Sequence, residues 1–329
     1  MLTLTKLIVM VGLPASTKSS YAEKLKLEYD AVVLSSDKLR EELLGDINSQ
    51  DKNTNVFDEM NKRAKQLLDN GQNVIIDATN INRKRRIHLI NNEIKADEYI
   101  VYYMNTPFAK CLYNDSQRGR NVGYEVINRM YKNMHIPTKL EGWDSVNWIN
   151  DDFKYEKQYR ELLEINLPFE DDYEFLFADL GKVIHEFDDI YEVPQDSTYH
   201  TFSISRHIYY TYEYIQENYK GTRMLEMLYA SLFHDLGKGH CKSFYNYEGE
   251  EQRHANFIGH ENVSAQLAAE YLVKLGYSDD FVKYVVDLIQ FHMMPMNASN
   301  KVTAKLKNLL ITEQFDDLMF LHEADRQAH

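Results

Sequence analysis

The 329-residue sequence predicts an α/β domain built on a parallel sheet with helices on both faces, followed by an all-α domain. Over residues 1–150, short apolar runs alternate with helical patterns, and strands that alternate with helices form parallel sheets covered on both faces. From His200 the pattern is helical throughout. Residues 151–190 are acidic but contain apolar helical stretches, which favours an ordered, partly helical connector over a flexible tether. We therefore expect domains at residues 1–150 and 191–329.

Composition favours a globular protein of the reducing cytoplasm. No run approaches the roughly 18 apolar residues of a membrane span, and no secretory leader pattern precedes the first strand. Two cysteines are too few for a disulfide framework. The net charge of −14 is uneven, because residues 1–150 carry 21 Lys and Arg against 19 Asp and Glu, whereas the rest carries 16 against 32. This balance argues against a general nucleic-acid coat protein and leaves room for a local basic groove in the first half.

The first strand, Lys6–Val11, is rich in β-branched residues and leads into a loop before Lys18-Ser19 opens a helix at 18–28. This order is the context that a phosphate-binding P-loop requires. The loop N–H groups would cradle the phosphates of ATP or another NTP, Lys18 would reach the β/γ oxygens, and Ser19 would hold Mg²⁺. We expect nucleotide contacts from Gly12, Ser16, Thr17, Lys18, Ser19 and Ser20. Thr17 replaces the second glycine of the motif, and its side chain would obstruct the approach of backbone to phosphate; an ordinary strand–loop–helix is the alternative.

The remaining elements of the first domain follow in order. Ala31–Ser35, Asn73–Asp77 and 99–103 are expected strands, with an edge strand within 142–148. Expected helices are 37–44, with Ser36 as N-cap, a second that ends at Asn70-Gly71, and a third at about 83–95. Ligands of parallel sheets bind beyond the carboxyl ends of the strands, and residues 12–19, 37–40 and 77–80 all fall at that edge.

Asp37 and Arg40 lie one helical turn apart and so share a face. Asp37 would accept the proton of an attacking hydroxyl while Arg40 orients the acceptor's phosphate; a first-turn carboxylate beside a solvated arginine is the alternative. Asp77 would assist Mg²⁺ or cap the next turn. The basic run 83–86 would contact phosphate or form a solvated face. Arg118, between two helical patterns, would be a lid arginine over the donor phosphates or a surface residue.

Five motifs can be compared with known families: Gly-Leu-Pro-Ala-Ser-Thr-Lys-Ser at 12–19, Ser-Asp-Lys-Leu-Arg at 36–40, Val-Ile-Ile-Asp-Ala-Thr-Asn at 74–80, Gln-Arg-Gly at 117–119 and Val-Ile-Asn-Arg-Met-Tyr-Lys-Asn-Met at 126–134. Together they resemble the kinase module of phage and bacterial 5′-OH polynucleotide kinases. The resemblance implies a P-loop kinase domain with Asp37 as general base, Arg40 on the acceptor phosphate and Arg118 in the lid. Asn114 stands where we would expect another lid arginine. Small-molecule kinases and zeta-type toxins share the P-loop and the Asp-x-x-Arg pattern.

The second half gathers imidazoles and carboxylates from several expected helices. In order these are His207, His234-Asp235, Gly259-His260-Glu261, Phe291-His292 and Ala324-Asp325, with Lys238 just after the second. Such sets suit divalent transition metals, which lower the pKa of bound water and polarise a phosphoryl oxygen, while Lys238 would contact a phosphate. Unconnected core or surface residues are the alternative.

This order resembles the HD phosphohydrolase superfamily, in the variety found in CCA-adding enzymes and RNA-repair fusions. The resemblance implies one metal held by His207, His234, Asp235 and Asp325, and a second at His260 and His292 that is bridged through Asp235. The expected metals are of the Mn, Fe, Ni, Co or Zn class. His240 and His254 would be substrate contacts or have no role. The sequence has no Asp-x-Asp-Gly-Thr signature, which excludes the phosphatase domain usual in phage kinase–phosphatases.

The two halves together resemble bifunctional RNA end-healing enzymes. The first domain would phosphorylate a 5′-OH end with an NTP, and the HD domain would remove a 2′,3′-cyclic, 2′- or 3′-phosphate. Broken RNA is the favoured substrate, with DNA ends as the alternative, a separate RNA ligase is the expected partner, and no membrane is involved. Two other interpretations stay open: a small-molecule or nucleotide kinase fused to a nucleotide phosphohydrolase, and an HD phosphohydrolase with a regulatory P-loop domain that Thr17 weakens.

Overall fold

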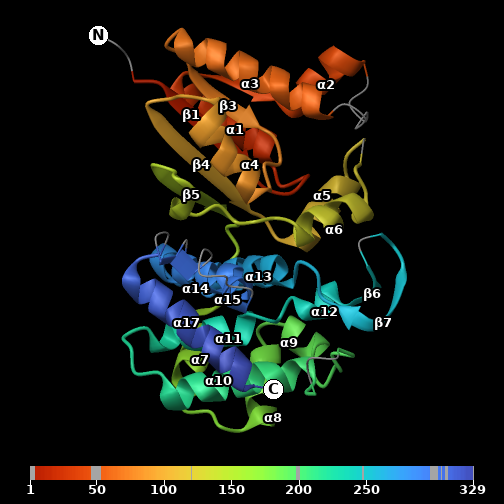
Figure 1. The fold of residues 1–329 in the computed structure, drawn as a ribbon, viewed down its shortest axis with the longest axis vertical. Helices are drawn as coiled ribbons and strands as arrows, with labels where there is room; N and C mark the ends of the chain where they lie inside the picture. Colours follow the sequence, from red (N-terminus) through yellow and green to blue (C-terminus); the bar gives the residue numbers. More distant parts are fainter. Residues whose placement is uncertain are drawn as a thin grey trace. The chain divides into compact units, whose positions relative to one another are not determined.

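The structure, a computed structural model, describes residues 4–45, 53–119, 121–197, 201–246, 248–296, 303–304, 306–307 and 310–328. The chain divides into two compact units, Met1–Asp151 (unit 1) and Asp152–His329 (unit 2), as Figure 1 shows. His200, where we expected the helical pattern to begin, lies outside the described residues.

Unit 1 is built on a five-stranded sheet in which all neighbouring strands are parallel. The strands are β1 (Lys6–Val11), β2 (Ala31–Ser35), β3 (Asn73–Asp77), β4 (Glu98–Asn105) and β5 (Ser145–Asn150), in the order β2-β3-β1-β4-β5. β1 is central, and its Ile8 lies opposite Ile75 on one side and Ile100 on the other. The predicted parallel sheet is confirmed.

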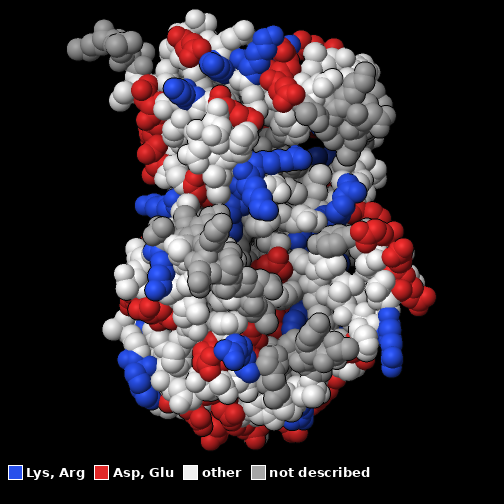
Figure 2. Space-filling model, viewed as in Figure 1, with Lys and Arg blue, Asp and Glu red and all other residues white. Residues whose placement is uncertain are grey.

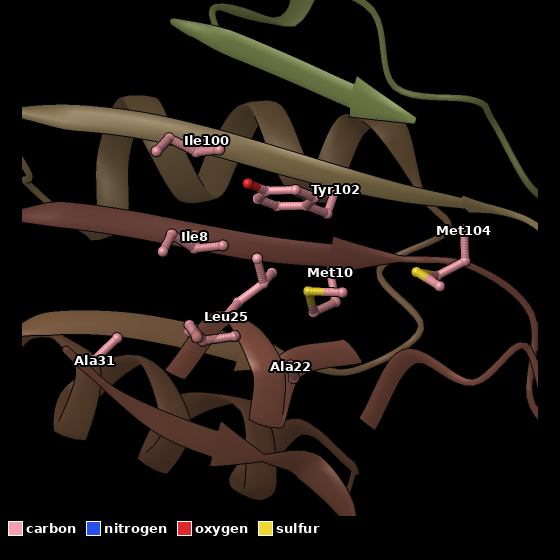
Figure 3. Close-up of a cluster of buried hydrophobic side chains, with 9 residues drawn as sticks. Ile8, Met10, Ala22, Leu25, Ala31, Ile100, Tyr102 and Met104 are labelled. Atoms are coloured by element: carbon pink, nitrogen blue, oxygen red, sulfur yellow. The ribbon is translucent and has the colours of Figure 1, made fainter. Parts of the chain in front are cut away.

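Both faces of this sheet are buried. Figure 3 shows Ile8 and Met10 of β1, with Ile100 and Tyr102 of β4, directed toward Ala22 and Leu25 of α1 (Lys18–Tyr29). Because successive side chains of a strand point to opposite faces, Leu7 and Val9 lie on the other face, and both are fully buried as well. Burial on both sides explains why these strands are continuous apolar runs without alternation.

The other helices of unit 1 are α2 (Ser36–Leu44), α3 (Asn53–Asp69), α4 (Arg83–His88), α5 (Phe108–Ser116) and α6 (Tyr124–Lys132). One prediction at a helix end was wrong: Ser36 is the first residue of α2, and Ser35 is the N-cap, without a side-chain capping bond. The helix expected at 83–95 begins at Arg83 as α4 and continues as a π-helical turn, Leu89–Glu93. A three-residue 3₁₀ turn, Lys139–Glu141, precedes β5.

Unit 2 is mainly helical, which confirms the predicted fold class. Its helices are α7 (Lys157–Asn166), α8 (Tyr173–Gly181), α9 (Glu186–Asp189), α10 (Ile204–Asn218), α11 (Met224–Phe233), α12 (Lys238–Cys241), α13 (His260–Lys274), α14 (Asp279–Phe291), α15 (Met293–Met296) and α17 (Thr312–Gln327). The sequence pattern missed a two-stranded antiparallel hairpin, β6 (Ser243–Tyr245) and β7 (Glu251–Asn256). Its residues are mostly exposed and polar, so they lack the apolar alternation that marks a half-buried strand.

Helices α7 and α8 pack within unit 2. The buried Tyr212 of α10 donates its hydroxyl to the carbonyls of Leu167 (2.6 Å) and Glu170 (2.8 Å), between α7 and α8. Part of the acidic excess of the second half lies on the surface here. Figure 2 shows acidic side chains crowding the end of unit 2 where Figure 1 draws α8, and Asp171, Asp172 and Glu174 are exposed. No helix among the described residues is both long and apolar enough to cross a membrane.

Candidate functional site

Two non-glycine residues of the loop after β1 have positive φ, Ala15 (61°) and Thr17 (66°). Left-handed residues of this kind occur in the nests of backbone N–H groups that bind anions. Gly12 is required by close packing, because a Cβ there would lie 2.9 Å from Ser16 Oγ and 3.0 Å from Met104 Cβ. Thr17 adopts the conformation that glycine favours and is the N-cap of α1. Its side chain is exposed, as are Ser19 and Ser20 beside it, whereas Ser16 is buried.

Lys18 is folded back into this loop. Its Nζ donates to the carbonyl of Leu13 and lies 3.3 Å from Ser16 Oγ. Burial lowers the pKa of Lys18 to about 8, although the carboxylate of Asp77 acts in the opposite direction. A phosphate in the loop would stabilise the charged form of this lysine.

Carboxylates at or just after the ends of two other strands, and one arginine from the α5–α6 segment, lie near Lys18. Asp77, at the end of β3, is buried and hydrogen-bonds Ser19; burial raises the pKa of Asp77, whereas Ser19 and Lys18 lower it. Arg118 and Asp37 also lie near enough for their charges to act on the pKa of Lys18, Arg118 lowering it and Asp37 raising it. The structure therefore brings these predicted residues to one edge of the sheet.

Asp37 and Arg40 form the pair expected on one face of α2. Arg40 Nη1 lies 2.9 Å from Asp37 Oδ1, and the Asp37 side chain is 69% exposed against 13% for Arg40. The carboxylate is thus oriented by the arginine and still open to a ligand.

The segment between α5 and α6, which carries Arg118, is tied down by Asp115. This buried carboxylate accepts hydrogen bonds from the backbone N–H of Val122 (3.0 Å) and of Gly123 (2.9 Å), and the Asp115 carbonyl accepts from Arg118 N. Asn114, where we expected a further arginine, donates from Nδ2 to the carbonyl of Ala15 at 3.0 Å. Asn114 therefore supports the phosphate loop and places no charge near it.

The basic run 83–86 is not a uniform solvated face. Arg86 is 2% exposed and forms a bidentate ion pair with the buried Glu141, with Nε–Oε2 2.7 Å and Nη2–Oε1 2.5 Å. Arg83 Nε lies 3.6 Å from the same carboxylate. Only Lys84 and Arg85 of this run are exposed. Glu141 was missed, because a lone glutamate 55 residues away gives no local signal.

The second site is a buried cluster at the centre of unit 2. His207, His234, Asp235 and Asp325 each offer an atom within 4.8 Å of the others, and Asp235, His260 and His292 do the same. All six side chains are buried, and Asp235 belongs to both sets. His240 and His254 belong to neither set.

Helix ends position three of these histidines. His234 and His292 are the C-caps of α11 and α14, and His260 is the first residue of α13 after Gly259, whose φ is 85°. Gly237 lets α12 approach α13 closely, because a Cβ there would lie 2.5 Å from the carbonyl of His260. This contact brings Asp235 within 3.2 Å of His260 Nε2.

The four histidines share one hydrogen-bond arrangement. Each Nδ1 lies against a backbone carbonyl: Ser231 for His234 (2.6 Å), Phe257 for His260 (2.9 Å), Ile289 for His292 (2.7 Å) and Ala328 for His207 (2.9 Å). A carbonyl only accepts, so Nδ1 must carry the proton, and a neutral ring then has its lone pair on Nε2. His207 Nε2 lies 2.9 Å from Asp325 Oδ1 and 3.2 Å from Asp235 Oδ2. Once Nε2 is deprotonated, imidazole nitrogens and carboxylate oxygens gathered in this way form a donor set that fits divalent metal ions.

Electrostatics in the cluster differ from one imidazole to the next. Burial lowers the pKa of His207, but Asp235 and Asp325 outweigh it and raise this pKa to about 9. Burial and the neighbouring His234 and His260 lower the pKa of His292 to about 3. Burial raises the pKa of Asp235, yet Lys238 and His234 outweigh it and hold this pKa well below its ordinary value.

Lys238 is held at the edge of the cluster. Its Nζ lies 2.6 Å from Asp235 Oδ2 and 2.9 Å from Gln195 Oε1, and both partners are buried. Gln195 was not among the predicted site residues. It lies in the segment before α10, where no pattern distinguishes it from other polar residues.

The structure defines a chain with a P-loop domain followed by a helical domain that contains a buried cluster of histidines and aspartates, and both domains match known families. Residues 7–137 match the AAA domain family, and residues 199–327 match the HD domain family. The predicted combination of a P-loop, kinase-like domain with an HD domain is confirmed.

Similarity to individual proteins is partial. The L-seryl-tRNA(Sec) kinase of Methanococcus maripaludis is 28% identical over 169 residues, covering 49% of this chain and 66% of that protein. The CC-adding tRNA nucleotidyltransferase of Thermus thermophilus is 32% identical over 106 residues, covering 32% of this chain and 23% of that protein. Among solved structures, the Pnkp1/Rnl/Hen1 complex is 24% identical with a TM-score of 0.31, covering 37% of this chain and 41% of that one. The Pnkp1/Rnl/Hen1 RNA repair complex is 23% identical with a TM-score of 0.34, covering 39% and 43%. The chain spans less than two thirds of each of these relatives.

Proposed function

We propose that this chain heals RNA ends with two active sites. Unit 1 transfers the γ-phosphate of ATP or another NTP to a 5′-OH, and unit 2 removes a 2′,3′-cyclic phosphate, or a 2′- or 3′-phosphate. One observation carries the proposal: the same chain combines a phosphate-binding loop that has a carboxylate–arginine pair at the same sheet edge with a buried cluster of four histidines and two aspartates.

In unit 1, the 5′-hydroxyl oxygen attacks the γ-phosphorus as Asp37 takes the hydroxyl proton, and the nucleoside diphosphate leaves. The Asp37 carboxylate is exposed and therefore accessible to this hydroxyl, and Arg40 orients the carboxylate, with Nη1 2.9 Å from Oδ1. Lys18 and the N–H groups of residues 12–20 hold the donor phosphates. Ser19 and Asp77, which are hydrogen-bonded to each other, would hold Mg²⁺, and Arg118 would stabilise the charge of the transferring phosphoryl group.

In unit 2, His207, His234, Asp235 and Asp325 would hold one divalent metal, and His260 and His292 would hold a second together with Asp235. Bound divalent metals would supply a polarised phosphoryl oxygen and a water of lowered pKa. Lys238 contributes a cation to a phosphate at the edge of the cluster, and Gln195 keeps its Nζ in place.

An RNA substrate is supported by the names of the relatives. The two curated relatives described above are named for tRNA, one as a kinase and one as a nucleotidyltransferase. The products of the proposed reactions, a 5′-phosphate and a 3′-end free of phosphate, are ends that a ligase can join. We therefore propose a separate RNA ligase as a partner and cytoplasmic RNA as the substrate.

A second candidate function is phosphorylation of a different hydroxyl. The kinase relative is named for L-seryl-tRNA(Sec), and its similarity favours an acceptor hydroxyl on a charged tRNA. The two candidates use the same P-loop and differ in the acceptor alone.

One RNA substrate tests the proposal. It carries a 5′-OH and a 2′,3′-cyclic phosphate and is offered with ATP and Mg²⁺ or Mn²⁺; both ends are expected to change. Lys18→Ala should abolish 5′ phosphorylation alone, and Asp235→Asn the 3′-end reaction alone. Lys24→Ala and His254→Ala, at exposed positions, are the matched controls and should retain both activities. If wild-type protein alters neither end, the proposal is wrong, and transfer to seryl-tRNA alone would establish the second candidate.

A further inference from the structure

Unit 1 contains a cavity that the proposed chemistry does not yet use. Its volume is about 450 Å³, and it lies beyond the carboxyl end of β3, where α3, the β3–α4 loop and α4 surround it. Much of its lining is apolar and comes from Phe57, Met60, Ile76, Ile81 and Leu89. A volume in this range with a partly apolar lining is typical of small-ligand sites.

The cavity adjoins the phosphate-binding loop. Thr79 and Asn80 line it, and both also contact the segment that leads into that loop. Gly12 N donates to the carbonyl of Thr79 at 3.1 Å, and Asn80 Nδ2 donates to the carbonyl of Met10 at 2.8 Å. A ligand in the cavity would therefore sit beside the phosphate site on the same edge of the sheet.

Two cations around the cavity are available to a ligand. Arg86 is committed to Glu141 and to the carbonyl of Asn80. Lys84 and Arg85 line the cavity and are exposed, and neither forms an ion pair within the described part of the chain. Figure 2 shows Lys and Arg side chains on unit 1 in the region where Figure 1 draws α4.

We infer that this cavity binds the 5′-terminal nucleoside of the RNA that accepts the phosphate. The base lies against the apolar lining and next to the Phe57 ring, because aromatic side chains stack on any base. Lys84 and Arg85 contact the phosphates that follow, which fixes the register of the strand without reading its sequence. The inference rests on the proposed kinase function and adds to it the site that separates a polynucleotide from a small acceptor.

Photocrosslinking locates the nucleoside directly. A 5′-OH oligoribonucleotide with 4-thiouridine as its first nucleotide is irradiated with the full-length protein, and the crosslinked peptides are identified by mass spectrometry. Crosslinks are expected within residues 57–61 or 79–89. Crosslinks confined to other segments, or none above those of an oligonucleotide with 4-thiouridine at its 3′ end, would overturn the inference.

Steady-state kinetics provides the second measurement. Ile81→Trp fills the cavity and should raise KM for the oligoribonucleotide about tenfold, which corresponds to about 1.4 kcal/mol. For the Ile81→Trp enzyme, kcat at saturating oligoribonucleotide and KM for ATP should stay within about twofold of the wild-type values. Phe57→Ala, which removes a ring without adding bulk, should act in the same direction if the tryptophan variant does not fold. The double variant Lys84→Ala, Arg85→Ala should raise the same KM and weaken its salt dependence, whereas Lys65→Ala, an exposed lysine of α3, should not.

Failure of this inference differs from failure of the proposed function. Absence of 5′ phosphorylation with crosslinks at the cavity would reject the kinase assignment and retain the nucleoside site. Active 5′ phosphorylation with crosslinks elsewhere and an unchanged KM in Ile81→Trp would reject the site and retain the kinase.

Discussion

Restoring a divalent metal to chelator-stripped protein is expected to raise the melting temperature of unit 2. The six buried ligand side chains come together only in the folded state, so a metal that binds them stabilises that state alone. The donor atoms of the cluster already lie close together, since His260 Nε2 lies 3.2 Å from Asp235 Oδ1.

The size of this effect follows from linkage. A ligand at 100 times its Kd contributes about 2.7 kcal/mol. For a domain of about 150–250 residues each kcal/mol shifts Tm by about 2–4 °C. Mn²⁺ at that excess should therefore raise the unit 2 transition by roughly 5–11 °C, whereas its effect on unit 1 should be much smaller.

Differential scanning calorimetry in EDTA, and after dialysis into Mn²⁺, Fe²⁺, Co²⁺, Ni²⁺ or Zn²⁺, provides the assay, with bound metal counted by elemental analysis. Asp235→Asn removes the carboxylate shared by both sets of ligands and should lose most of the shift. His254→Ala, whose ring lies outside the cluster, should keep it. A wild-type transition that none of these metals moves, or a full shift in Asp235→Asn, would refute the metal-site reasoning.

Three further predictions concern unit 1. Arg86→Ala should lower the free energy of unfolding in urea by about 3–5 kcal/mol, because it leaves Glu141 buried without its bidentate partner; Lys84→Ala should change it little, and equal effects would contradict the assigned role. Thr17→Gly should raise the same free energy by about 1 kcal/mol, because Thr17 is left-handed, whereas Thr17→Ala should bring no such gain. Burial, with Arg83 and Arg86, lowers the pKa of His135 to about 4, so the unfolded state binds more protons below an ordinary pKa of about 6.5. Stability should therefore fall as pH drops from about 6.5 to 4, and His135→Gln should flatten that dependence in urea titrations at each pH.

The sheet of unit 1 could be predicted because its signals are local. The strands Ala31–Ser35 and Asn73–Asp77 have the bounds that their apolar runs indicated, because polar or turn residues flank each run on both sides. Helix ends were harder to predict. Ser35 and Ser36 are both acceptable N-caps by residue type, and the choice between them depends on the residue at which β2 ends.

The site could be predicted in its residue types and less well in its contacts. In sequence, Arg86 was one of four cations; in the structure it is the partner of Glu141, which no local pattern connects to it. In the sequence, Asn114 stands where an arginine was expected. Only the fold shows that its side-chain amide donates a hydrogen bond to the carbonyl of Ala15. Gln195 gave no signal, because its link to Lys238 joins residues 43 apart.

The histidine cluster shows why some long-range geometry can still be anticipated from local chemistry. His234, His260 and His292 each direct Nδ1 to the carbonyl three residues earlier, at the end or start of a helix. This short-range bond fixes the tautomer and leaves Nε2 for the cluster, so a histidine at a helix end beside other candidate ligands is already a partly oriented donor. His207 lies within α10 and uses the carbonyl of Ala328 instead, 121 residues away. That bond ties His207 to the end of α17, the helix that carries Asp325, so the ligand set is completed only when α17 docks on α10. Displacing α17 should therefore weaken metal binding more than loss of the Asp325 carboxylate alone, because it takes with it both that carboxylate and the carbonyl that orients His207.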